Sequence, residues 1–358
     1  MNTQSQNIQP ASPPATPFVP PYAASWVNWL TRQIERLPIP LWVFYLALWI
    51  LLGTITTVLE WLAGTYAVGT VNFFHIVFAA GIPYILGAMH YLNRYASTAM
   101  RNFRPVLKTN PLQYQELEYR LTVQPARTTL FWCVVLVAAS LNSLFFADTA
   151  VEAMQLARTP LALTWGALLV IGWNSLGAAW FYQIYRFMHM VNQIYDEYTQ
   201  IDLFQQSVLY GFSGLLARAS LSVMFAFTTM FLTADWLFTT TVSVASTAFF
   251  VLLAATIFLL PLQHIHGRLV TEKQHRLGQV GARIQTGIEN LEKQVDADDA
   301  DNAAQTKDVL TALETAQRLL EKIPTWPWQP ETIRLIITAL LLPIALFIFQ
   351  FIIRKLVE

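Results

Sequence analysis

Seven long apolar runs constrain this chain more than any other feature of its sequence. A helix needs about 20 mainly apolar residues to cross the roughly 30 Å hydrocarbon core of a bilayer, and each run comes near that length. The runs cover residues 41–62, 71–92, 129–147, 161–182, 221–238, 241–260 and 335–353. We therefore expect an all-α fold, a polytopic membrane helix bundle of about seven transmembrane helices.

The composition agrees with a membrane protein and excludes other classes. Charged residues make up 12% of the chain and hydrophobic residues 55%, whereas a soluble domain has about 25% charged residues. Too few polar groups remain to cover a water-facing surface, so we expect membrane lipid to cover part of it. The formal net charge is zero, which gives no reason to expect a nucleic-acid partner. The single cysteine, Cys133, cannot form an internal disulfide.

The basic residues predict which helix ends face the cytoplasm. Lys and Arg accumulate on the cytoplasmic side of short loops. With the N-terminus inside, only Arg158, Arg354 and Lys355 of the 22 basic residues lie outside. The sequence thus predicts an N-in, C-out protein of the cell membrane, which we interpret as the bacterial inner membrane.

This orientation divides the chain into a membrane domain with helical extensions on the cytoplasmic side. Residues 41–262 would form six spans, with inner helical loops at 93–128 and 183–218. Residues 335–353 would form the seventh span. The short outer loops predict that the first six spans pair as three helical hairpins.

Three further segments lie outside the predicted spans. Residues 1–24 are rich in Pro, Gln, Ser, Thr and Ala and carry no charge, so we expect a disordered N-terminal tail. Residues 25–37 gather apolar side chains on one helical face, which predicts an interfacial amphipathic helix. Residues 263–323 repeat apolar positions at helical spacing on both sides of a polar turn, the pattern of a cytoplasmic coiled-coil hairpin.

The predicted hairpin and the odd number of spans both indicate partners. The apolar positions of the hairpin pack on each other or on a cytoplasmic protein, which would bind through residues 269–323. A homo-oligomer is the second expectation, because a lone seventh span is free to meet other copies.

Four histidines end three of the apolar runs at the predicted inner boundary: His90, His189, His264 and His266. Neutral imidazole binds Zn, Cu, Fe and Ni, so histidines from three helices at one depth could hold a metal or a haem. The alternative is that each histidine anchors its own helix at the interface. The sequence leaves both interpretations open, and we expect no bound cofactor.

Polar residues inside the apolar runs are candidate pore or ligand contacts. Glu60 lies near the outer end of the first span, where it either serves a function or reaches water. Asn142 and Asn174 lie in the third and fourth spans, and hydrogen-bonded helix packing is their alternative role. Thr338 and Gln350 lie in the seventh span and would line a pore if that helix surrounds one.

The motifs of soluble enzymes are missing from the sequence. It contains no Gly-x-x-x-x-Gly-Lys phosphate loop, no His-Glu-x-x-His, no Gly-x-Ser-x-Gly and no Cys-x-x-Cys. We therefore expect a protein that performs no covalent catalysis.

Two resemblances extend this interpretation. The segments 203–218 and 322–330, the latter Lys-Ile-Pro-Thr-Trp-Pro-Trp-Gln-Pro, resemble segments of uncharacterised bacterial multipass membrane proteins, which implies no activity. In architecture the chain is similar to the insect odorant and gustatory receptor channels. That family has seven spans, N-in and C-out, inner helices that form an anchor domain, and a last span that lines a tetrameric cation pore.

The end of the last span carries the second resemblance. In the family it reads Thr-Tyr, five apolar residues and Gln-Phe, and here it reads Pro343-Ile344, five apolar residues and Gln350-Phe351. The resemblance implies an oligomeric ion channel or chemosensory receptor. Two alternatives stay open, a non-conducting sensor or scaffold that binds a partner through the hairpin, and a metal or haem protein built on the interfacial histidines.

Overall fold

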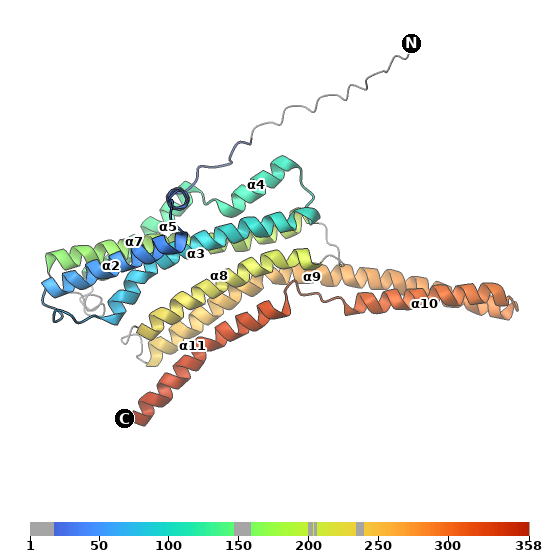
Figure 1. Ribbon diagram of the computed structural model, residues 1–358. Coiled ribbons are helices and arrows are strands. Elements are labelled where there is room, and N and C mark those ends of the chain that lie inside the picture. Colours follow the sequence, from blue (N-terminus) through green and yellow to red (C-terminus); the bar gives the residue numbers. More distant parts are fainter. Residues whose placement is uncertain (1–17, 147–158, 200–202, 204–205, 234–239, 358) are drawn as a thin grey trace, which may run out of the picture.

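The computed structural model describes residues 18–146, 159–199, 203, 206–233 and 240–357. These residues form ten α-helices and one short 3₁₀ helix, and they include no β-strand beyond isolated bridges. The α-helices, labelled in Figure 1, are α1 (Trp26–Glu35), α2 (Leu41–Leu62), α3 (Phe73–Phe103), α4 (Pro111–Thr122), α5 (Ala126–Phe146), α7 (Pro160–Glu197), α8 (Gln206–Thr233), α9 (Thr240–Asp296), α10 (Ala300–Lys322) and α11 (Pro330–Val357). The all-α prediction is confirmed.

Five helices are long and apolar enough to cross a membrane: α2, α3, α7, α8 and α9. In α5 the described apolar stretch is shorter and covers Ala126–Leu141. The seventh predicted run lies within α11. The fold is therefore compatible with a membrane helix bundle, while the number of seven spans and their orientation stay predictions.

Three helices continue far beyond their apolar runs. Helix α3 has 31 residues, α7 has 38 and α9 has 57. At 1.5 Å per residue, α9 is about 85 Å long. The first part of each extension that the sequence places after the second, fourth and sixth spans is thus a continuation of the same helix, and the rest belongs to separate helices, among them α4, the start of α8 and α10. Even Pro261 does not end α9, and its neighbour Leu262 is fully buried.

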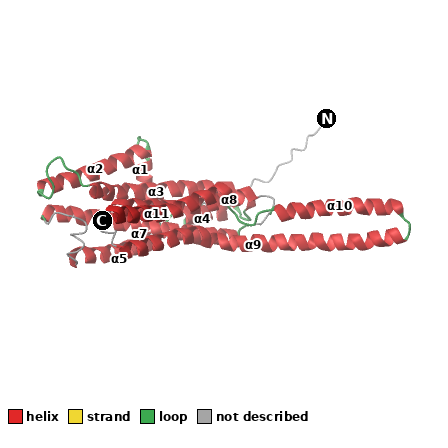
Figure 2. Cartoon of the chain, turned by 90° about the horizontal axis from the view of Figure 1, so that it is seen from below, coloured by secondary structure: helices red, strands yellow, loops and turns green. Residues whose placement is uncertain are grey.

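The helices form two layers, with α2, α3, α5 and α7 in one and α8, α9 and α11 in the other (Figure 1). Helix α3 joins them because it packs against α2 and α7 on its own side and against α8 across the layers. Helix α7 makes a second junction with α9. We call the end of the bundle from which α9 and α10 project the hairpin end (Figure 2).

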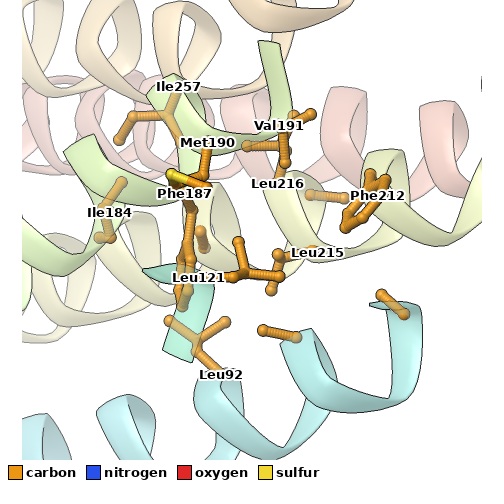
Figure 3. Packing of buried hydrophobic residues seen from close by; sticks show 14 of the residues in the cluster. Leu92, Leu121, Ile184, Phe187, Met190, Val191, Phe212, Leu215, Leu216 and Ile257 are labelled. Carbon is orange, nitrogen blue, oxygen red and sulfur yellow. The ribbon is translucent and has the colours of Figure 1, made fainter. Parts of the chain in front are cut away.

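The core lies where the two layers meet. Figure 3 shows side chains from both layers interdigitating there, among them Phe187 of α7 and Leu215 of α8, which are fully buried. Next to them, the ring of Phe103 packs against Phe212 at 4.7 Å and against Tyr195 at 5.5 Å between centroids. Burying one such side chain contributes roughly 1.5–3 kcal/mol, so this junction holds the layers together.

The outward faces of the bundle are apolar, unlike those of a water-soluble protein. On α2, Trp42 is 68% exposed, Ile50 58% and Leu62 76%. On α5, Phe131 is 59% exposed. Lipid tails are as apolar as these side chains, so the faces need no protein partner in a bilayer.

A close approach of α3 and α7 explains why position 81 is glycine. A Cβ atom built there would lie 2.0 Å from the ring of Trp173. The Trp173 Nε1 donates a 2.8 Å hydrogen bond to the carbonyl oxygen of Phe78, and the two rings stack at 5.6 Å. Only a residue without a side chain lets the indole reach the α3 backbone.

Candidate functional site: the projecting helical hairpin

The base of the hairpin is fixed by the segment that joins α10 to α11. The Lys273 ammonium donates to the carbonyl oxygens of Glu321 at 2.7 Å and Ile323 at 2.9 Å, which satisfies the last turn of α10. The ring of Trp326 stacks at 3.8 Å on His266 and at 4.2 Å on Trp328. The Pro- and Trp-rich segment therefore lies against α9.

The two arms of the hairpin pack closely along their length. A Cβ at Gly287 of α9 would lie 2.7 Å from Leu310 of α10, so glycine brings the arms together at this level. Nearer the tip, the Thr306 hydroxyl donates a 2.7 Å hydrogen bond to the Gln294 side chain. Most of the apolar positions at helical spacing are half-buried between the arms, among them Leu277, Val280, Ile284, Leu291 and Leu313.

The tip of the hairpin is a polar turn. Asp299 caps α10 because its side chain accepts from the backbone N–H of Asn302. Asp298 has φ 57°, a left-handed conformation that Asp tolerates better than most residues. Asp299 thus serves to start α10.

Packing between two arms leaves other apolar side chains without cover. Ile288 and Val295 lie one heptad apart on α9 and are 46% and 63% exposed. On α10, Val309 is 55% exposed and Leu319 57%. These four are apolar side chains of the hairpin that the packing of its own arms does not cover.

One face of the hairpin forms a shallow groove of about 660 Å³, which we call the hairpin groove. Its lining residues include Ala282, Thr286, Asn290, Gln294, Thr306 and Val309. They alternate small or apolar groups with amides and hydroxyls. Arg283 is the one lining residue with a full charge. The groove is therefore suited to a helix that offers both an apolar stripe and hydrogen-bonding groups.

The four interfacial histidines have separate partners. Nε2 of His90 lies 2.7 Å from Glu35, and Nε2 of His264 lies 2.8 Å from Asp196. His266 contacts the Thr325 carbonyl oxygen at 3.1 Å. The fourth, His189, is exposed, and its ring stacks on Tyr185 at 6.4 Å.

The structure does not bring these four imidazoles together as one site. Throughout the described part of the chain, no group of three or more His, Cys, Asp or Glu side chains is placed to hold a metal ion. His90 and His264 instead contact acidic side chains of other helices, α1 and α7, and His266 contacts the segment that joins α10 to α11.

The candidate pore residues are dispersed over four helices. Glu60 is buried in α2, and the Asn174 side chain donates a 2.8 Å hydrogen bond to the Val170 carbonyl oxygen of its own helix. Thr338 is exposed on α11. The side chains of Asn142 and Gln350 lie outside the described residues.

Sequence reasoning missed the groups that surround His90. Its partners are Glu35 and Tyr45, from α1 and α2. One signal could have found the first of them, because Glu35 is the only acidic residue before Glu60. Nothing in the sequence pointed to Tyr45.

Comparisons with known proteins add no family to this geometry. The chain matches no protein-family model, and neither the curated proteins nor the solved structures contain a match.

Proposed function

We propose that this protein is a membrane-anchored scaffold that performs no covalent chemistry. In this proposal the apolar helices hold it in the bacterial inner membrane, and the hairpin projects into the cytoplasm. The hairpin groove binds an amphipathic helix of a cytoplasmic protein. The observation that carries the proposal is the groove itself, together with the exposed Val309 on its α10 side.

The shape of the hairpin supports a helical occupant. Two packed helices present a furrow along their junction, and a third helix laid in it buries apolar stripes on all three, as in helix-in-groove recognition. The amides of Asn290 and Gln294 would then find hydrogen-bond partners on the incoming helix and set its register. The sensor alternative shares this surface and differs only in requiring a signal.

Site-specific photo-crosslinking in intact cells tests the proposal. A photoreactive amino acid at Gln305, which lines the groove, should give one discrete adduct with a cytoplasmic protein. The same amino acid at Thr311, exposed on α10 and outside the groove lining, is the matched control and should give none. No adduct from Gln305, or equal adducts from both positions, contradicts the proposal.

A pair of arginine substitutions then separates binding from folding. Val309→Arg should weaken the adduct at least roughly tenfold, because it would bury a charge in the interface. Thr311→Arg should leave the adduct unchanged. Both positions are exposed, so both variants should keep the elution volume of the wild-type protein. An adduct between two copies of the 40.6 kDa chain would instead assign the groove to self-assembly.

The channel hypothesis stays a prediction that rests on the seventh run and on the resemblance at its end. Its residues Thr338 and Gln350 both belong to α11, which packs against α8 and α9 of its own chain.

A further inference from the structure

A second groove lies in the membrane part of the molecule, between α2 and α8 on the surface of α3. It encloses about 930 Å³ and is almost entirely apolar. We call it the membrane groove. One wall is formed by Trp42, Leu46 and Trp49 of α2, and the other by Leu221, Phe225, Ala226 and Met230 of α8.

The floor of the membrane groove is the surface of α3, where small residues leave space between the two walls. Ala80, Gly87 and Ala88 line it. The distance between floor and walls is set by specific contacts, because the Tyr84 hydroxyl donates a 2.7 Å hydrogen bond to the Ser222 carbonyl oxygen of α8. On the other side, the Trp49 Nε1 donates a 2.9 Å hydrogen bond to the Ile76 carbonyl oxygen. The groove is thus a built feature of three helices.

A single cation, Arg218 of α8, lines this otherwise apolar groove. Its Nε donates to the Tyr91 hydroxyl at 2.8 Å, its Nη1 donates to the Gly214 carbonyl oxygen at 3.1 Å, and its guanidinium lies 4.0 Å from the Tyr95 ring centroid. These contacts hold the guanidinium in place. They supply no negative charge, and within the described residues Arg218 forms no ion pair.

Arg218 lies just before the apolar run 221–238, so the sequence predicts that it lies at the inner membrane boundary. Its partner Tyr91 directly follows His90, which contacts Glu35 of the amphipathic helix α1. A guanidinium at this depth, next to an apolar groove and without a carboxylate, needs an anion that also carries apolar chains. The planar guanidinium matches phosphate oxygens better than an ammonium does.

We propose that the membrane groove is a binding site for one anionic phospholipid. The lipid phosphate accepts hydrogen bonds from the guanidinium of Arg218, and an acyl chain lies on the floor of small residues between the walls of α2 and α8. The site is independent of the hairpin groove, and it would anchor α2 to α8, which both pack against α3.

Native mass spectrometry of the purified full chain tests this site. Detergent-solubilised protein is supplied with phosphatidylglycerol or with phosphatidylcholine, which share acyl chains and differ in net charge. We expect wild-type protein to retain one phosphatidylglycerol in preference to phosphatidylcholine. Equal retention of the two lipids would overturn the proposal. Inorganic phosphate alone should not displace the lipid. Displacement by phosphate would show that the acyl chain does not contribute to binding, which contradicts the proposal.

Variants locate the bound lipid. Arg218→Gln should reduce phosphatidylglycerol retention roughly tenfold, the effect of losing a charge-assisted hydrogen bond, while Arg218→Lys keeps part of the preference. The matched control is Arg127→Gln, at an exposed arginine of α5 outside the groove lining. Ala80→Trp on the floor and Thr229→Trp on the α8 wall should each lower retention of both lipids because they fill the groove. Retention that these variants leave unchanged would show lipid bound elsewhere.

Discussion

The carboxylate of Glu35 lies 2.7 Å from Nε2 of His90, whose other ring nitrogen lies 3.1 Å from the hydroxyl of Tyr45. The three side chains come from α1, α3 and α2, so this chain of hydrogen bonds joins three helices. A neutral imidazole with its proton on Nε2 satisfies every group, since Nε2–H then donates to the carboxylate and Nδ1 accepts from the tyrosine. The His90 side chain is only 4% exposed, so water cannot replace these partners.

A double-mutant cycle should reveal this coupling. His90→Phe is expected to lower the free energy of unfolding by about 1–3 kcal/mol because it removes the contacts with both Glu35 and the half-buried Tyr45 hydroxyl. Tyr45→Phe should also destabilise, and the double variant should cost less than the sum of the two. His189→Phe is the control, since His189 is exposed and phenylalanine keeps the ring stacked on Tyr185. Additive effects in thermal unfolding would show that His90 and Tyr45 act independently.

A second polar contact fixes the N-terminal segment to the bundle. Nη2 of Arg186 in α7 donates a 2.7 Å hydrogen bond to the Tyr22 hydroxyl, which itself donates to the Val123 carbonyl oxygen at 2.8 Å. Arg186 is buried and also donates to the Arg120 carbonyl oxygen. Tyr22→Phe should therefore lower the free energy of unfolding by about 1–2 kcal/mol.

The pH dependence of the stability difference between wild type and Tyr22→Phe shows that the stabilisation comes from the Tyr22 hydroxyl and not from its ring. Burial raises the pKa of Tyr22 above its usual value of 10.0, and Arg186 offsets part of that rise. Because the folded pKa is the higher one, the stabilisation is complete below about pH 10 and is lost as the pH rises through the folded pKa. The difference between wild type and Tyr22→Phe should thus be constant from pH 7 to 9 and shrink above pH 10. A difference that grows in alkali would contradict this.

The sequence predicts helices well and contacts poorly in this chain, for identifiable physical reasons. Apolar runs and heptad spacing are local patterns along the sequence, so they locate helices such as α2 and the two arms of the hairpin directly. They do not say where a helix stops once its apolar run ends. Polar continuations such as the second half of α9 stay helical because no residue between Pro261 and Asp296 breaks them.

Contacts between residues that are far apart in the chain are harder to predict. Tyr22 and Arg186 are 164 positions apart, and neither belongs to a motif. The membrane groove depends on small side chains at Ala80 and Ala88, which in the sequence are ordinary members of an apolar run. By contrast, the hairpin groove follows from a pattern that the sequence displays, because two arms with exposed apolar positions must leave some of them uncovered.

The orientation of the protein is open to a direct labelling test. Single cysteines at Asp308, exposed on α10, and at the C-terminal Glu358 are compared in a Cys133→Ala background. The distribution of Lys and Arg predicts that Asp308 faces the cytoplasm and Glu358 the outside. A membrane-impermeant maleimide should therefore label the second cysteine in intact cells and the first only after permeabilisation. Equal labelling of both would exclude a membrane span between residues 308 and 358, and with it the seven-span, C-out prediction.

The last prediction separates a scaffold from a channel. A pore requires a polar path through the helix bundle. Among the α11 side chains that the structure describes, those turned outward are mainly apolar, with Leu341 55% exposed, Ile348 51% and Phe349 61%. Such a face is typical of contact with lipid tails. We therefore expect proteoliposomes containing the purified chain to pass K⁺ and Na⁺ no faster than protein-free vesicles.

Substitution at Gln350 decides between the two interpretations of α11. In a scaffold the amide is a packing or interfacial group, so Gln350→Leu should change stability by about 1 kcal/mol or less and leave ion flux at the level of empty vesicles. In a channel the same substitution removes a polar contact from the pore and changes conductance or ion preference. Thr332→Val, near the start of α11, is the control for a polar residue of the same helix far from Gln350. If the wild-type protein shows sustained ion flux that Gln350→Leu alters and Thr332→Val does not, the scaffold proposal is wrong and the protein is an oligomeric channel.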